Sequence, residues 1–180
     1  MAYAEQRPLE TSITLILEQF DPALAEAHWE LYPERIPEHI RLSLTLLYPW
    51  IPAWEVTETD LEQLRSFFAG RRPFEFELTY VSEFPDLVVY AVPEPDEELR
   101  SLMRALWALY PDYPPYRRPG SDPPPHATLG RLEGDYAITL ERARERVERL
   151  LPVRCFITEA TLMEEYELDR MRIRETFPLG

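Results

Sequence analysis

The feature that most constrains the fold is a short pattern that occurs twice in the chain. Residues 43–46 read Ser-Leu-Thr-Leu and residues 126–129 read His-Ala-Thr-Leu, each alternating a polar with an apolar side chain. Alternate side chains of a strand share a face about 6 to 7 Å apart, so each segment predicts a half-buried strand. Each is followed by a helix-forming segment, which indicates an internal duplication of two αβ halves.

Periodicity and capping residues predict the remaining elements of what we expect to be one domain, residues 1–180. Strands are expected over residues 12–18, 40–47, 74–81, 87–92, 153–157, 160–166 and 170–177. Helices are expected from Asp21 to about Tyr32, from a capping box at Thr59–Glu62 to Phe68, and from Pro95 and Thr139 onward. Residues 110–125 predict an irregular loop that lines a site. His28 is expected to be a solvated helical residue, and Cys155 a core residue without a catalytic role.

Composition excludes several classes of protein. The net charge is −14, which disfavours binding to a long nucleic-acid duplex. All 19 basic residues are arginine, so lysine-adenylate ligases, Schiff-base enzymes and P-loop lysines are excluded. The sequence shows neither a membrane span nor a secretory leader, and we expect a cytoplasmic protein without a membrane partner.

The two motifs and their flanks resemble those of the 2H phosphoesterase superfamily, in particular the bacterial proteins similar to 2′-5′ RNA ligases and cyclic phosphodiesterases. That family carries two His-x-Thr/Ser motifs, the first usually followed by Leu-Leu-Tyr-Pro and an aromatic residue. Residues 43–50 match this string except at the first position, and residues 126–129 match the second motif. The resemblance covers nearly the whole chain.

The resemblance implies an α+β fold in which bilobal, pseudo-symmetric antiparallel sheets with flanking helices surround a central cleft. It also implies catalysis without a metal or another cofactor, in which two histidines transfer protons in opposite directions and two hydroxyl residues bind phosphate oxygens. The corresponding residues here are Ser43, Thr45, His126 and Thr128. The expected partner is a small nucleotide or an RNA-end phosphate; protein partners stay unassigned.

Ser43 departs from the family pattern at a position that matters for catalysis. A serine hydroxyl can bind a phosphate oxygen, but it does not titrate near pH 7 and cannot replace imidazole as an acid or base. Loss of one such partner lowers a rate by about 10² to 10⁴. His39 lies about 13 Å along the strand, which is too far for a substitute unless the strand bulges. A Ser43 nucleophile activated by His126 is also disfavoured, because it needs a contact of about 3 Å.

Further residues are candidates for substrate binding: Arg41, which shares the Ser43 face; Arg131, which follows the second motif; and Tyr48 and Tyr116, which offer rings for a base. The alternative role is an ion pair with an acidic residue for each arginine, which the 33 acidic residues favour, and aromatic packing against the loop for the two tyrosines.

Three functions remain open at this stage. The first is a 2H phosphoesterase-like protein that binds a small nucleotide or phosphate ester, with activity weak, altered or absent. The second is an active cyclic phosphodiesterase that uses His126 with a noncanonical partner. The third is a noncatalytic adaptor that binds a protein through its acidic surface or the Trp50 to Trp54 segment.

Overall fold

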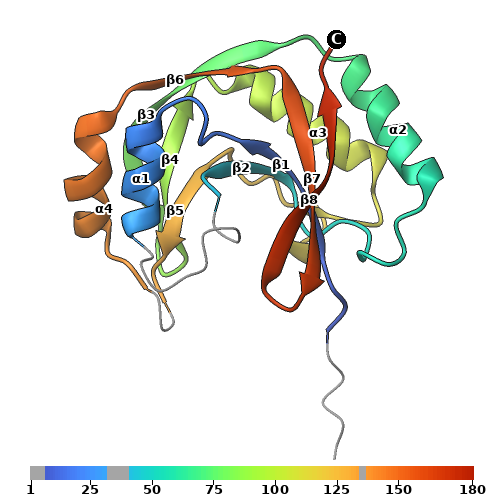
Figure 1. The fold of residues 1–180 in the computed structure, drawn as a ribbon, viewed down its shortest axis with the longest axis horizontal. Coiled ribbons are helices and arrows are strands. Elements are labelled where there is room, and N and C mark those ends of the chain that lie inside the picture. The colour runs from blue at the N-terminus through green and yellow to red at the C-terminus, as the bar shows by residue number, and fades with distance from the viewer. Residues whose placement is uncertain (1–6, 32–40, 134–136) are drawn as a thin grey trace, which may run out of the picture.

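The computed structural model describes residues 7–31, 41–133 and 137–180, which form eight strands and four α-helices (Figure 1). The strands are β1 (Thr11–Ile16), β2 (Ser43–Leu47), β3 (Phe74–Phe84), β4 (Val88–Glu94), β5 (Ala127–Arg131), β6 (Val153–Ile157), β7 (Glu159–Glu167) and β8 (Arg170–Pro178). The helices are α1 (Pro22–Glu30), α2 (Glu58–Ala69), α3 (Glu97–Leu109) and α4 (Leu140–Val147). The expected α+β class is confirmed.

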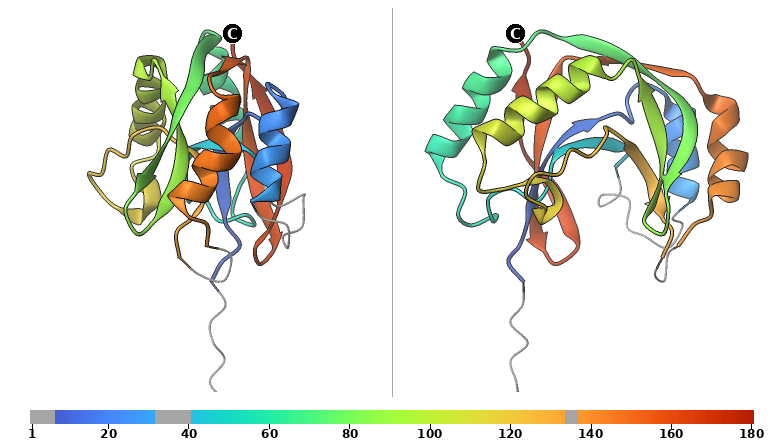
Figure 2. Two further views of the ribbon diagram at one scale, coloured as in Figure 1. Left: turned by 90° about the vertical axis from the view of Figure 1, so that its left-hand side faces the viewer. Right: turned by 180° about the vertical axis from the view of Figure 1, so that it is seen from behind.

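All eight strands belong to one antiparallel sheet with the order β6-β3-β4-β5-β2-β1-β7-β8. The two expected sheets are therefore the halves of a single sheet, which bends into an arch with the helices on its outer side (Figures 1 and 2). The strands that carry the repeated pattern, β2 and β5, are neighbours at the middle of the sheet. This central position is the one that the expected duplication implies, because each half of the sheet contributes one motif strand to the junction.

The helices pack on the sheet as their apolar faces require. α3 contacts β2, α2 contacts β8, and α4 contacts both β3 and α1. The apolar residues of the two motif strands, such as Leu44 and Ala127, have no exposed surface and belong to the hydrophobic core. Within the described ranges, no helix combines the length and the apolar character needed to cross a membrane.

Several helix ends lie where the sequence predicts them. The Asp21 side chain accepts a hydrogen bond from the backbone N–H of Leu24 at 2.8 Å, and Thr139 caps α4 in the same way. Gly70 is the C-terminal cap of α2. The proline and aspartate of the predicted hairpin turn connect β3 to β4, and Asp86 adopts the left-handed conformation with φ of 62°.

The start of α2 was predicted wrongly, because the sequence contains two overlapping capping patterns. The N-cap is Thr57 rather than Thr59: the hydroxyl of Thr57 accepts from the backbone N–H of Asp60, whose carboxylate accepts from the Thr57 N–H. Val56 and Leu61, which flank this cap, are both buried. A buried apolar pair at these two positions is a hydrophobic staple, and it selects the earlier of the two possible starts.

His28 is the second correction. Its side chain is buried rather than solvated, with 3% of the residue exposed. The helical period explains this position, because His28 lies four residues after the buried Leu24 and adjacent to the buried Ala27. The spacing of His28 from Leu24 in the sequence therefore indicated that His28 is buried. Cys155, by contrast, is a fully buried core residue as expected, and burial raises the pKa of its thiol to about 12.

Candidate active site

The two motifs lie side by side across the junction between β2 and β5. Leu44 is paired with Ala127 in antiparallel orientation, which brings the middle residues of the two motifs opposite each other. This register places the first residue of each motif diagonally across from the first residue of the other. The polar residues Ser43, Thr45 and Thr128 are partly exposed, whereas their apolar neighbours are buried against the helices. We call the surface formed by Ser43, Thr45, His126 and Thr128 the motif face.

Each motif strand carries an irregularity directly after its threonine. On β2 the pairing with β1 shifts after Thr45, and on β5 the pairing with β4 shifts after Thr128. In both cases the following leucine, Leu46 or Leu129, is the extra residue. A bulge of this kind reverses the alternation of side chains beyond it. The two halves therefore share the distortion as well as the sequence pattern.

The bulge on β5 determines where Arg131 points. Arg131 lies opposite Val88, while Thr128 lies opposite Tyr90. Val88 and Tyr90 are two residues apart on β4 and so share one face of the sheet. Arg131 consequently belongs to the motif face, although simple alternation from Thr128 would place it on the other side. Its side chain is exposed and forms no ion pair within the described parts of the chain.

Side chains from two helices hold the backbone at these bulges. The indole N–H of Trp107 on α3 donates a hydrogen bond of 2.8 Å to the carbonyl of Leu46. His28 on α1 hydrogen-bonds to the backbone of Thr128. Burial lowers the pKa of His28 to about 4, against the opposing effect of this bond. His28 is thus a neutral residue near pH 7 that helps to fix the second motif strand from the helix side.

His126 lies in an aromatic enclosure and is only 8% exposed. Its Nδ1 lies 2.8 Å from the carbonyl oxygen of Pro124, and its Nε2 lies 3.4 Å from the hydroxyl of Tyr116. The rings of Phe84 and Tyr90 contact the imidazole edge to face. A carbonyl only accepts, so the neutral ring carries its proton on Nδ1 and presents a lone pair on Nε2. Burial lowers the pKa of His126, and the Pro124 contact partly offsets that effect.

The hydroxyl groups of the motif face are available to a ligand. Those of Ser43, Thr45 and Thr128 form no hydrogen bond with the described part of the chain. Thr14, directly opposite Thr45 on β1, has a buried hydroxyl that likewise lacks a partner there. Hydroxyls of this kind donate to anionic oxygens. Among the described residues, no cluster of three His, Cys, Asp or Glu side chains is placed to hold a metal ion.

Tyr48 and the loop after α3 close one side of this region. The backbone N–H of Tyr116 donates to the carbonyl of Tyr48 at 2.6 Å, and Arg117 forms an ion pair with Glu10. The Tyr48 hydroxyl donates to the same buried carboxylate. Tyr116 and Arg117 both have positive φ, at 53° and 55°, a strained conformation that these contacts stabilise. The role of Glu10 was not foreseen, since nothing local in the sequence connects it with Arg117.

The other candidates are placed as follows. The ring of Tyr116 lies 6.2 Å from that of His126 in a stacked arrangement, with 36% of the residue exposed. Burial raises the pKa of its hydroxyl to about 12. Arg41 forms an ion pair of 2.5 Å with Glu18, which is the alternative role considered for it. His39 falls outside the described residues.

Solved structures of other proteins share the fold of this chain. The chain resembles solved structures that include E. coli LigT complexed with 3′-AMP (20% identity, TM-score 0.60, covering 97% of this chain and 99% of that one). It also resembles a protein described as a phosphoesterase (21% identity, TM-score 0.57, the same coverage) and TT0787 of Thermus thermophilus (19% identity, TM-score 0.54, covering 94% and 97%). A search of curated proteins found no significant match. The model of the 2′-5′ RNA ligase superfamily matches residues 17–169, most of the chain, and the protein belongs to that family.

Proposed function

We propose that this protein binds a small phosphate ester of the nucleotide class on the motif face, and that it turns over 2′,3′-cyclic phosphates poorly. The observation that carries the proposal is the adjacent, antiparallel placement of the two motifs, in which only one supplies an imidazole. Three hydroxyls without partners in the described chain lie on the motif face, and Arg131 shares this face. Such donors bind phosphate oxygens despite the acidic surface, because distant charge is screened over about 8 Å at physiological salt.

Turnover requires two proton transfers. Opening a cyclic phosphate removes a proton from water and delivers one to the departing alkoxide, so the reaction needs a base and an acid. The lone pair on Nε2 of His126 suits this residue to the role of base. Ser43 has no titrating group with which to supply the second proton. Binding without efficient turnover is the expected result.

The relatives support this choice of ligand. E. coli LigT has been solved with phosphate and with 3′-AMP, ATP and NADP+. These ligands share a phosphate group, which is also what the hydroxyls and Arg131 of the present chain are suited to hold. The likeness in structure concerns the fold, and the ligand class for this chain rests on its own motif residues.

Calorimetry provides the test. We expect 2′,3′-cyclic AMP to bind the wild-type protein and adenosine to bind much more weakly, because the phosphate supplies the hydrogen-bond acceptors. Thr128→Val, which keeps the shape of the side chain and removes the hydroxyl, should weaken cyclic AMP binding by about tenfold or more, since bonds to a charged group contribute about 1.5 to 3 kcal/mol. Equal affinity for the nucleoside and its cyclic phosphate would contradict the proposal.

A second candidate, an active phosphodiesterase, has one observation in its favour. The hydroxyl of Tyr116 lies 3.4 Å from Nε2 of His126, close enough to serve as the missing proton donor after a small movement. This hydroxyl is protonated at neutral pH, as a proton donor requires, but burial raises its pKa to about 12 and so makes it a weak acid. If Tyr116 has this role, the wild-type protein will hydrolyse 2′,3′-cyclic AMP and Tyr116→Phe will lower kcat by about 10² or more without changing KM.

A further inference from the structure

The loop after α3 places the ring of Tyr116 over His126. The two rings are stacked with their centroids 6.2 Å apart, and the Tyr116 hydroxyl lies 3.4 Å from Nε2, the nitrogen that carries the lone pair. Phe84 on β3 and Tyr90 on β4 contact the imidazole from the sheet, and none of the three rings is charged near pH 7. Of these rings, only that of Tyr116 comes from a loop. Its position therefore decides how much water reaches Nε2, and we call this ring the cover.

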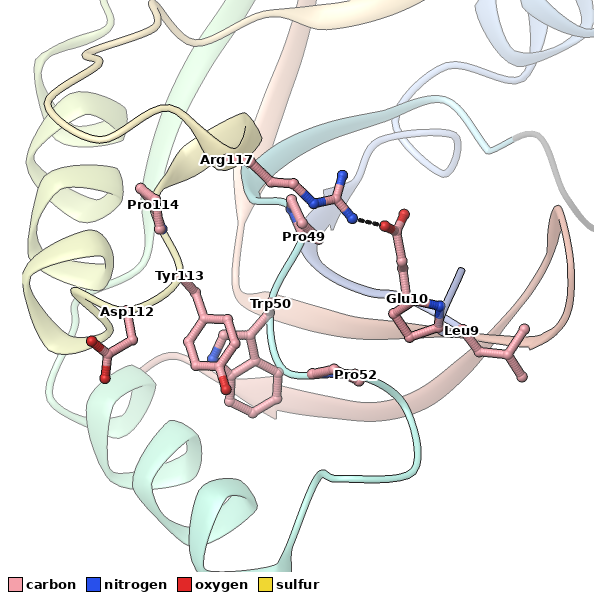
Figure 3. Close-up of a pocket in the computed structure, with 10 residues that line it drawn as sticks. Leu9, Glu10, Pro49, Trp50, Pro52, Asp112, Tyr113, Pro114 and Arg117 are labelled. Atoms are coloured by element: carbon pink, nitrogen blue, oxygen red, sulfur yellow. Dashed lines mark hydrogen bonds and ion pairs between the residues drawn. The ribbon is translucent and has the colours of Figure 1, made fainter. Parts of the chain in front are cut away.

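The backbone of this loop needs support from other parts of the chain. Tyr116 and Arg117 both have positive φ, which residues with a side chain retain only when their surroundings hold them there. The backbone N–H of Tyr116 donates to the carbonyl of Tyr48 at 2.6 Å. Figure 3 shows the guanidinium of Arg117 paired with the carboxylate of Glu10. The hydroxyl of Tyr48 donates to the same carboxylate. Both residues of the strained pair are therefore held, directly or through Tyr48, by Glu10.

Glu10 is itself fixed by the sheet. It directly precedes β1; its backbone N–H donates to the carboxylate of Glu165 at 2.7 Å, and its carbonyl accepts from the Glu165 N–H at 2.8 Å. Only 5% of the Glu10 side chain is exposed, whereas the Arg117 side chain is 62% exposed. A charge-assisted hydrogen bond to a buried carboxylate is stronger than an ion pair between two exposed groups. Glu10 is therefore the fixed partner, and Arg117 joins the loop to it.

Glu10 and His126 belong to different halves of the sheet. Glu10 and Tyr48 adjoin β1 and β2 in one half, whereas His126 directly precedes β5 in the other. The loop spans the junction between the halves, because Tyr116 contacts His126 on one side while Arg117 contacts Glu10 on the other. The carboxylate of Glu10 can therefore act on the histidine across the junction, through the loop.

We propose that Glu10 is a positioning residue for His126: its carboxylate holds Arg117 and Tyr48, and through them it keeps the cover over Nε2. The inference goes beyond the proposed function, because the position of the cover can be tested without any ligand. Its chemical consequence is that Glu10 controls the solvation of the imidazole. With the cover in place, burial lowers the pKa of His126. Without the cover, water reaches Nε2 and the pKa of His126 rises towards its ordinary value of about 6.5.

Titration of His126 by NMR provides the test, with its signal among those of the three histidines assigned from the spectrum of His126→Gln. Glu10→Gln keeps the shape of the side chain and removes its charge, and we expect it to raise the pKa of His126. Loss of an anion by itself lowers the pKa of an imidazole, so a rise reports the lost cover. Tyr116→Ala, which removes the covering ring, should raise the pKa of His126 at least as far. Adding Glu10→Gln to Tyr116→Ala should then produce no further rise.

The matched control is a second ion pair that joins the same loop to the rest of the chain. Arg104→Gln breaks the pair between Arg104 on α3 and Asp122, and it should leave the pKa of His126 unchanged, because this pair does not contact Tyr116 or Arg117. An unchanged or lowered pKa of His126 in Glu10→Gln would overturn the inference, as would an equal rise in Arg104→Gln. Should Glu10→Gln fold poorly, Arg117→Gln, at an exposed side chain, takes its place, and the absence of a rise there would overturn the inference as well. None of these outcomes depends on whether a phosphate ester binds.

Discussion

Replacing Ser43 by histidine tests most directly whether the missing second imidazole limits the hydrolysis of 2′,3′-cyclic phosphates by this protein. The register of β2 and β5 places position 43 diagonally across from His126. Diagonal neighbours in an antiparallel pair lie about 7 to 8 Å apart, which leaves room for a phosphate between two imidazoles. Ser43 is partly exposed and its hydroxyl has no partner in the described chain, so the larger side chain does not have to break an existing contact there.

We expect Ser43→His to raise the rate of 2′,3′-cyclic AMP hydrolysis by about 10² or more, which corresponds to about 2.7 kcal/mol of activation free energy. The pH profile should become bell-shaped. His126, whose pKa burial lowers, acts as base above that pKa; the introduced imidazole, at a partly exposed position, acts as acid below its ordinary pKa of about 6.5. The optimum therefore lies between the lowered pKa of His126 and 6.5.

Steady-state kinetics of the purified variants provides the assay. Ser43→Gln, which adds bulk without a group that titrates, is the matched control and should show no gain. Adding His126→Ala to Ser43→His should abolish the gain. The two-histidine reasoning is refuted if Ser43→His folds and binds cyclic AMP but hydrolyses it no faster, or if Ser43→Gln gains equally.

Three further predictions concern stability and binding. The pKa of His28 is lower in the folded protein than in the unfolded chain, so the free energy of unfolding should fall by about 3 kcal/mol on account of His28 as the pH falls from 6.5 towards 4. In urea unfolding, His28→Gln should lack this part of the acid sensitivity. An unchanged pH dependence in the variant would contradict the prediction. Tyr110→Phe should leave the free energy of unfolding unchanged or raise it by up to about 1 kcal/mol, because the buried hydroxyl has no partner among the described residues; a loss above 1 kcal/mol would show that this hydroxyl is satisfied after all. Arg131→Gln should weaken the binding of inorganic phosphate, measured by calorimetry, and make that binding less dependent on salt. If Arg131 does not contribute to the motif face, the substitution will change neither the affinity nor its salt dependence.

The strands of the motif region were predictable because their alternation is local. Leu44 and Ala127 had to face the core once their polar neighbours faced outward, and the structure has them fully buried. The pairing of β2 with β5 depends on contacts between distant parts of the chain, so only the duplication suggested it. The ion pair between Glu10 and Arg117 joins residues 107 positions apart and had no signal of its own.

The bulges show a different limit of sequence analysis. An extra residue on a strand leaves no mark in the hydrophobic pattern when that residue is itself an apolar one, as Leu46 and Leu129 are. Beyond such a residue, simple alternation of side chains along the strand assigns each residue to the wrong face of the sheet. Arg131 was nevertheless among the candidates for substrate binding, because that choice rested on its nearness in sequence to the second motif and not on the alternation of side chains.

The narrow connection between the half-sheets has a consequence for motion and its detection. β2 and β5 are joined through the pairing of Leu44 with Ala127, whereas the pairings within each half run over four or more residues. The junction is therefore the place where the arch can open and close with the least loss of backbone hydrogen bonds. A ligand that contacts both motif strands would link the two half-sheets across this junction. Its binding should slow amide hydrogen exchange along β2 and β5 while the outer strands, β6 and β8, exchange as before.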